Sequence, residues 1–230
     1  MKIYKHLLFD LDDTLLDYKK TEHNAIEFVF NLYNIDSSNI ELFSQINNDL
    51  WKKLEKGLVE RQKLKIRRFE ILFEELNINR VDPVIIAGVY EDYISQITIP
   101  FEKAEPVLKK LHEKEYVISL ITNGSLNVQS RRLEGASFNG YISNTFVSEM
   151  IGYNKPNPSY FDYVINTLGA KREECLIIGD SLTSDILGGI NSHIDTCLVD
   201  YNQNKNTNEI TPTYTINDLN DIFGILGEVK

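Results

Sequence analysis

The second half of the chain alternates short apolar runs with stretches of helical spacing, and this alternation restricts the fold more than any other feature. Helices are expected at residues 107–114, after Ser125, at 159–168 and at 186–191. Strands are expected at residues 117–121, 146–148, 176–178 and 196–199, with a last edge strand at 214–216. This alternation is typical of parallel βαβ units. We therefore expect an α/β fold with a Rossmann-like, doubly wound parallel sheet.

A further strand is expected far from the others, at the apolar residues 7–9. After it, apolar residues recur at helical spacing in four stripes that include Ala25, Phe28, Val29 and Leu32, then Leu50 and Trp51, then Phe69 and Leu72, then Val89 and Tyr93. Spacing of this kind predicts amphipathic helices rather than strands. The expected organisation is a Rossmann-like core domain of residues 1–16 and 98–230, with an inserted all-helical cap domain of residues 17–97.

The composition limits the possible partners. The 230 residues have a formal net charge of -10, which argues against a nucleic-acid polymer or an anionic membrane surface as the partner. No apolar run approaches the roughly 18 residues of a membrane helix. The two cysteines, Cys175 and Cys197, lie in apolar runs and are predicted to be free core thiols. We expect a cytoplasmic protein that acts on a small molecule, either as a monomer or as a dimer.

Polar side chains of particular kinds follow the expected strands at the point where each one ends. They are Asp10 and Asp12 after the first strand, Thr122 and Asn123 after the second, Lys155 beyond the third, and Asp180 and Asp185 after the fourth. Because parallel strands end at one edge of a sheet, these residues are expected to share one crevice. Carboxylates, a lysine and a hydroxyl in one crevice are groups that phosphoryl transfer uses.

Four carboxylates in one crevice would repel one another, by up to about 4 kcal/mol for the closest pair at an effective dielectric near 20. A divalent cation relieves this repulsion, and Mg²⁺ suits a site with few carboxylates and a phosphate oxygen. We predict that Asp10 and Asp180 bind Mg²⁺ directly and that the carbonyl of Asp12 is a further ligand. Asp185 is expected to orient either a metal-bound water or Lys155.

The same residues suggest a reaction. Asp10 can attack phosphorus and form an aspartyl phosphate, which divides the hydrolysis of a phosphate ester into two displacements. Asp12 is placed to act as the general acid and then as the general base. Lys155 and the metal would neutralise the phosphoryl oxygens, and the Thr122 hydroxyl and the backbone amide of Asn123 would complete the phosphate site.

Segments 10–14, 122–124, 155–156 and 179–185, in that order, resemble the four signature motifs of the haloacid dehalogenase superfamily. The resemblance implies a Rossmann-like core with a helical cap inserted between the first two motifs. The cap segment 55–73 and the tail 212–216 further resemble the YjjG-type pyrimidine 5'-nucleotidases. That likeness implies nucleoside monophosphates, such as dUMP and dTMP, as substrates.

Three other functions are alternatives to a Mg²⁺-dependent phosphomonoesterase. A 2-haloacid dehalogenase uses the same nucleophile on carbon, but Asp12 and Asp180 disfavour it because such enzymes typically lack the second aspartate and need no metal. A phosphomutase would use the same residues but retain the phosphoryl group, and the sequence hardly separates it from a phosphatase, although the cap resemblance favours hydrolysis. A phosphatase or phosphomutase acting on a sugar phosphate or on phosphoglycolate is therefore kept as an alternative. A signalling receiver domain lacks both the inserted helices and an acid–base group at Asp12.

Overall fold

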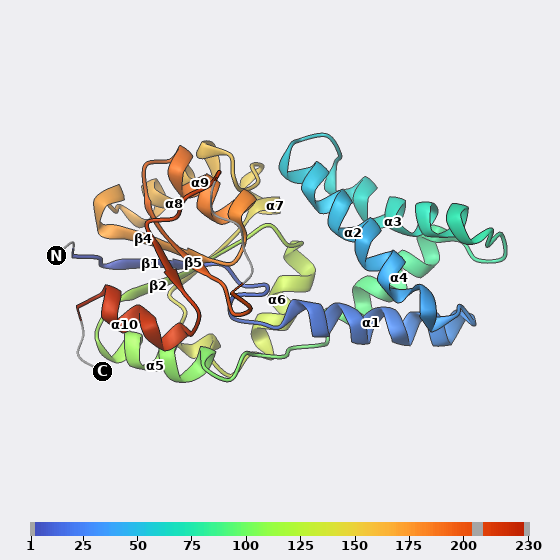
Figure 1. Cartoon of the computed structure of the whole chain (residues 1–230), viewed down its shortest axis with the longest axis horizontal. Coiled ribbons are helices and arrows are strands. Elements are labelled where there is room, and N and C mark those ends of the chain that lie inside the picture. The colour runs from blue at the N-terminus through green and yellow to red at the C-terminus, as the bar shows by residue number, and fades with distance from the viewer. Residues whose placement is uncertain (1–2, 204–208, 228–230) are drawn as a thin grey trace.

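The structure is a computed structural model in which residues 3–203 and 209–227 are described. It has two parts, a layered α/β part and a group of helices beside it (Figure 1). The main elements in chain order are β1 (His6–Phe9), α1 (Tyr18–Tyr33), α2 (Ile40–Glu55), α3 (Arg61–Leu76), α4 (Pro83–Ile94), α5 (Ala104–Glu113), β2 (Val117–Thr122), α6 (Leu126–Glu134), β3 (Asn144–Val147), α7 (Ser148–Ile151), α8 (Pro158–Leu168), β4 (Cys175–Gly179), the π-helical turn η4 (Leu182–Ile186), α9 (Leu187–Asn191), β5 (Asp195–Val199), β6 (Tyr214–Ile216) and α10 (Ile222–Ile225).

The six strands form one sheet in the order β3-β2-β1-β4-β5-β6, and each neighbouring pair is parallel. Strand β1 lies in the middle, where Phe9 is aligned with Leu120 of β2 and with Ile178 of β4. The carboxyl ends of these three strands therefore meet at one edge. The expected Rossmann-like parallel sheet is confirmed, and the short 214–216 segment is its edge strand.

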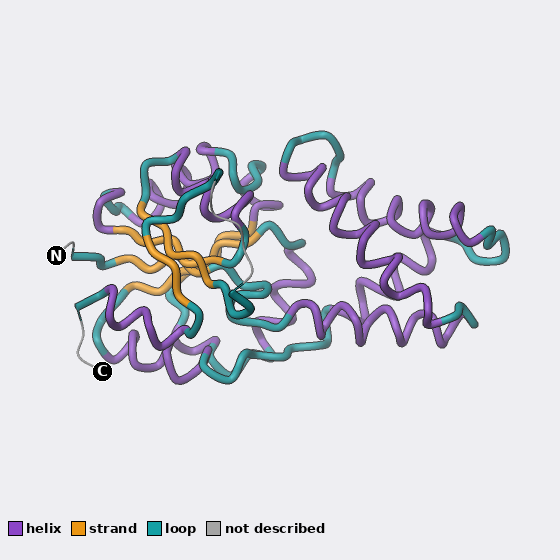
Figure 2. Tube along the Cα trace, in the orientation of Figure 1, coloured by secondary structure: helices purple, strands orange, loops and turns teal. Residues whose placement is uncertain are grey.

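Both faces of the sheet are covered by helices, so the strands lie between two helical layers (Figure 2). Leu7 and Phe9 of β1 pack in a cluster with residues of α5 and α10, whereas Leu8 packs on the opposite face with residues of α8. Successive strand side chains point to opposite faces, so a strand buried on both sides reads as a continuous apolar run. This is why residues 7–9 show no alternation of polar and apolar side chains.

Two element boundaries differ from the sequence expectation. Strand β3 ends at Val147, and Ser148 begins α7, because the Ser148 carbonyl accepts a hydrogen bond from Gly152 N instead of continuing the sheet. The helix expected at residues 186–191 is α9, which begins at Leu187 and directly follows the π-helical turn η4. Both changes occur at the edge of the sheet where the polar residues gather.

Helices α1 to α4 pack around a core of their own, which also includes Val128 of α6. The first predicted stripe is partly wrong, since Phe28 and Leu32 are 39% and 54% exposed and Ile26 and Phe30 occupy the core instead. The carboxylate of Asp17 accepts a hydrogen bond from Lys20 N and begins α1. We propose on this basis that residues 17–97 form a cap domain and that residues 1–16 and 98–230 form the core domain.

Both cysteines, Cys175 and Cys197, are buried and free. Among the described residues, no helix combines the length and the apolar character that crossing a bilayer requires.

Candidate active site

A cavity of about 230 Å³ lies between the carboxyl edge of the sheet and the helices of the cap. All seven residues selected from the sequence line it: Asp10, Asp12, Thr122, Asn123, Lys155, Asp180 and Asp185. They come from the ends of β1, β2 and β4, from the loop after α7 and from η4. The cap contributes other lining residues, among them Tyr18, Asn48, Trp51, Arg68 and Tyr90. The cavity is therefore enclosed by both parts of the chain.

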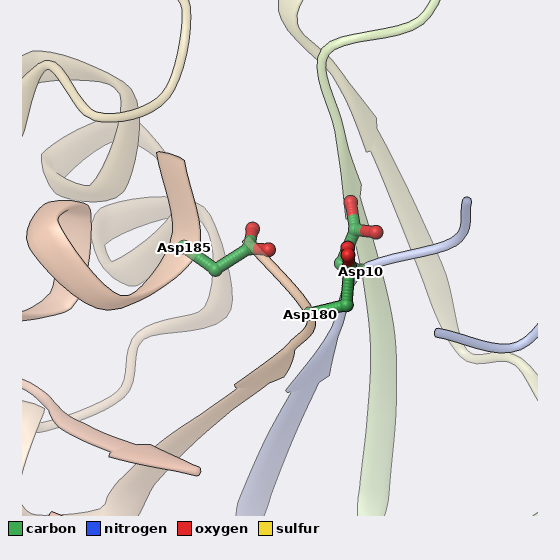
Figure 3. Close-up of side chains that lie close together, drawn as sticks. All are labelled: Asp10, Asp180 and Asp185. Atoms are coloured by element: carbon green, nitrogen blue, oxygen red, sulfur yellow. The ribbon is translucent and has the colours of Figure 1, made fainter. Parts of the chain in front are cut away.

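Three carboxylates gather at one side of this cavity. Asp10, Asp180 and Asp185 each place an oxygen within 4.8 Å of the other two. Asp10 and Asp180 follow neighbouring strands, and Asp185 extends toward them from η4 (Figure 3). A Cβ on Gly179 would collide with the Asp185 carboxylate, so glycine lets this side chain approach the end of β4. A cluster of hard carboxylate oxygens is a donor set that fits Mg²⁺.

Lys155 lies against two of the three carboxylates. Its Nζ atom is 2.6 Å from Asp10 Oδ1, 2.6 Å from Asp185 Oδ1 and 2.9 Å from the Ile121 carbonyl oxygen. Burial raises the pKa of Asp10 well above its ordinary value, against the opposing effect of Lys155. Burial alone lowers the pKa of Lys155, but the charges of Asp10 and Asp185 raise it above the ordinary value. Asp185 thus contacts Lys155 directly, and its role beside a metal-bound water stays a prediction.

Asn123 ties the loop that carries Lys155 to the end of β2. Its side-chain Nδ2 donates to the Lys155 carbonyl at 2.9 Å, and its Oδ1 accepts from Lys155 N at 2.8 Å. The Thr122 hydroxyl oxygen accepts hydrogen bonds from Gly124 N at 3.0 Å and from Gln129 Nε2 at 2.9 Å. The two hydrogen bonds of the Asn123 side chain to the Lys155 backbone orient the loop that carries Lys155, and the sequence did not predict this contact.

Asp12 has partners that the sequence reasoning missed. Arg132 Nη1 donates to Asp12 Oδ1 at 2.6 Å, and Gln129 Nε2 donates to Oδ2 at 2.7 Å. Both donors belong to α6, which begins just beyond Thr122 and Asn123. Their separation by three residues places them on one face of that helix, which is the only sequence signal for this contact.

Two cap arginines also contribute to the site. Arg61 of α3 donates to the Asn123 carbonyl, to Ser148 Oγ at 2.6 Å and to Asn154 Oδ1 at 2.6 Å. Arg68 is 2% exposed, and its guanidinium lies 4.3 Å from the ring centroid of Tyr90. Arg61 therefore connects α3 of the cap to Asn123, Ser148 and Asn154, and Arg68 lines the cap side of the cavity.

The fold and the motif geometry agree with a family match. Residues 4–193 match the family model described as haloacid dehalogenase-like hydrolase, so the chain belongs to this family of enzymes. The HAD-hydrolase YfnB of Bacillus subtilis is 33% identical over 229 residues, which cover 98% of this chain and 97% of YfnB.

Two named pyrimidine 5'-nucleotidases are similar over nearly the full length. PynA of Streptococcus pneumoniae is 31% identical over an alignment that covers 97% of this chain and 95% of PynA. YjjG of Escherichia coli is 29% identical over 96% of each chain. The crystal structure of YfnB, which contains bound magnesium and reveals interdomain movement, superposes with a TM-score of 0.91 at 31% identity and covers 98% of this chain and 100% of that one.

Proposed function

We propose that this hydrolase is a Mg²⁺-dependent phosphomonoesterase that works through an aspartyl phosphate. The observation that supports this most strongly is the pairing of Asp10 with Lys155, 2.6 Å apart, in a cavity that Asp12 also lines. A nucleophile, a fixed positive charge and a separate acid–base group within one cavity are what an in-line phosphoryl transfer through an enzyme carboxylate requires.

In the first step, an oxygen of Asp10 forms a bond to phosphorus as the bond between phosphorus and the ester oxygen breaks. The ester oxygen keeps the electron pair and takes a proton from Asp12, so the alcohol leaves neutral. Lys155 stabilises the negative charge on the phosphoryl oxygens, and the Thr122 hydroxyl and Asn123 backbone amide bind the same group.

In the second step, water attacks the phosphorus of the aspartyl phosphate and gives a proton to Asp12. The bond between phosphorus and the Asp10 oxygen breaks, which releases phosphate and restores the Asp10 carboxylate. Asp12 thus gives one proton in the first step and takes one back in the second. The Asn123 side chain keeps Lys155 in place during both steps through its two hydrogen bonds to the Lys155 backbone.

Mg²⁺ would be held by Asp10, Asp180 and the Asp12 carbonyl, with Asp185 acting on a water ligand or through Lys155. When bound, the ion supplies positive charge that allows Asp10 to approach an anionic phosphate. The carboxylate cluster supports this choice, because its oxygens lie within 4.8 Å of one another.

The substrate that we propose is a nucleoside 5'-monophosphate, with preference for pyrimidines. Similarity to PynA and YjjG over nearly the whole chain, cap included, supports this substrate class. The cap also provides the aromatic side chains Tyr18, Trp51 and Tyr90 on the cavity wall, where a leaving nucleoside would lie. Such a small metabolite fits the cytoplasmic location expected from the sequence.

A panel of phosphate esters, assayed with Mg²⁺ and with EDTA, tests the proposal. The panel contains dUMP, dTMP, AMP, sugar phosphates and phosphoglycolate, and Asp10→Asn serves as the inactive variant. We expect Mg²⁺-dependent phosphate release that is fastest with dUMP or dTMP, and none from Asp10→Asn. Isomerised sugar phosphate without free phosphate would indicate a mutase, and halide release from 2-haloacids that survives EDTA would indicate a dehalogenase.

A further inference from the structure

Both carboxylate oxygens of Asp12 are held by side chains of helix α6. Arg132 donates to Oδ1 at 2.6 Å, and Gln129 Nε2 donates to Oδ2 at 2.7 Å. The same Nε2 lies 2.9 Å from Thr122 Oγ1, and Gln129 Oε1 accepts from Arg132 Nη1 at 3.1 Å. One network of hydrogen bonds thus fixes Asp12 relative to Thr122, a residue of the proposed phosphate site.

The buried guanidinium of Arg132 is paired with the carboxylate of Asp12. The Arg132 side chain is 1% exposed, and among the described residues its ion pair is with Asp12, whose side chain is 25% exposed. A buried guanidinium is costly unless a carboxylate neutralises it. Packing therefore leaves Arg132 little freedom to turn away, and the position of Asp12 follows the position of Arg132.

Arg132 also contacts both segments that connect the cap to the core. Its Nε donates to the Ile97 carbonyl at 3.3 Å, and its own carbonyl accepts from Thr98 Oγ1 at 2.9 Å. Its guanidinium lies 5.7 Å from the ring centroid of Tyr18, the first residue of α1. A movement of the cap must bend these two connections, so it must also change the surroundings of Arg132.

We propose that Arg132, assisted by Gln129, is a positioning residue that places Asp12 at the ester oxygen when the two cap connections have the arrangement described above. This inference depends on the proposed function, in which Asp12 protonates the leaving alcohol. Arg132 then links the position of the cap to the step that needs Asp12.

Two kinds of ester separate this role from a general structural one. When a nucleoside leaves, its oxygen needs the proton of Asp12, as in the first step above. When p-nitrophenol leaves, the electron pair of the broken bond remains on a stable nitrophenolate ion that needs no proton. Displacement of Asp12 should therefore slow the first step for a nucleotide much more than for p-nitrophenyl phosphate, whereas a distorted site should slow both alike.

The experiment measures the first step in single-turnover rapid-quench assays with saturating Mg²⁺, using dUMP and p-nitrophenyl phosphate. Arg132→Met removes the positive charge, and Arg132→Lys keeps it but loses the forked geometry. For Arg132→Met we expect a decrease of about 10- to 100-fold with dUMP, and of less than about 3-fold with the nitrophenyl ester. Arg132→Lys should show the same contrast with a smaller decrease.

Arg131→Met is the matched control, because Arg131 is the neighbouring arginine of α6 and pairs with Asp92 at the surface of the cap, where it is 49% exposed. It should keep both rates within about 2-fold of wild type, since exposed ion pairs contribute little.

If Arg132→Met does not fold, Arg132→Lys decides the question by the same contrast between esters. Equal losses with the two esters, or an unchanged dUMP rate, would overturn the inference. A wild-type enzyme that releases phosphate from neither ester would instead refute the proposed function on which it depends.

Discussion

The Lys155 ammonium group lies 2.6 Å from the Asp10 carboxylate, although 145 residues separate them in the chain. The same group is 2.6 Å from Asp185, so one buried cation faces two buried carboxylates. Asp180 adds a third carboxylate to this cluster. Three carboxyl groups thus face one ammonium group, and binding of the proposed Mg²⁺ to them should stabilise the fold.

Replacement of Lys155 by methionine should therefore destabilise the protein most in the absence of metal. The buried carboxylates of Asp10 and Asp185 then lack their counterion. This loss should lower the free energy of unfolding by about 3 kcal/mol in EDTA. Added Mg²⁺ should restore part of this loss, while phosphatase activity stays at least about 100-fold below wild type. Urea unfolding with EDTA and with Mg²⁺ measures the effect. Lys171→Met, at an exposed position, is the control, and equal unfolding midpoints for the two variants in EDTA would refute the prediction.

Asp180→Asn tests the metal site directly. Removal of one carboxylate charge from the cluster should weaken Mg²⁺ binding by at least about 10-fold, because the ion prefers charged oxygen ligands. Isothermal titration calorimetry measures the affinity, and phosphate release should need correspondingly more Mg²⁺. Asp162→Asn removes a carboxylate that pairs with Arg172 in a surface ion pair, so it should bind Mg²⁺ like the wild type. An unchanged affinity in Asp180→Asn would exclude Asp180 as a ligand.

Arg61→Ala should loosen the contact between cap and core. Arg61 connects α3 to Asn123, Ser148 and Asn154, and its loss leaves the loop next to Lys155 without this support. We expect kcat/KM for dUMP to fall by about 10-fold or more, because small misplacements of reacting groups are costly. Small-angle scattering should show a larger radius of gyration. Lys63→Ala, on the same helix with a 72% exposed side chain, should change neither quantity. Equal behaviour of the two variants would show that Arg61 does not hold the cap.

Glu22 should make the stability of the cap depend on pH. Burial raises the pKa of this carboxyl above its ordinary value of 4.5, although Ser44 and Asn47 donate hydrogen bonds to it. The folded protein therefore binds this proton more tightly than the unfolded chain does. It follows that the contribution of Glu22 to the free energy of unfolding is lost as the pH rises from 4.5 through the raised pKa.

The variant Glu22→Gln removes this titration and should be less sensitive to pH than the wild type over that range. Urea unfolding at a series of pH values above 4.5 measures the difference between the two proteins. Glu27→Gln, an exposed position on the same helix, provides the control and should follow the wild type. If the free energy of unfolding changes with pH in the same way for the wild type and Glu22→Gln, the buried carboxyl does not make stability depend on pH.

The parallel sheet could be predicted from the sequence because its strands are buried on both faces, which requires continuous apolar runs such as residues 7–9 and 176–178. The position of Asp10, Thr122 and Asp180 in one crevice followed from the same rule, since parallel strands end at one edge. The boundary at Ser148 and the exposure of Phe28 could not be predicted. They depend on which competing hydrogen bond or neighbouring helix is present after packing.

The primary structure by itself determined which chemical groups reach the sheet edge, because strand period and chain direction are local properties of the sequence. Only the tertiary structure decided that Arg132 and Gln129 hold Asp12, that Arg61 reaches Asn123, and that Lys155 lies between two carboxylates. Helical spacing tells which face of a helix is buried, but the angle and depth at which that helix docks depend on all its neighbours at once. Contacts between side chains more than 100 residues apart, such as Gln129 with Asp12 at a separation of 117, are set by that docking.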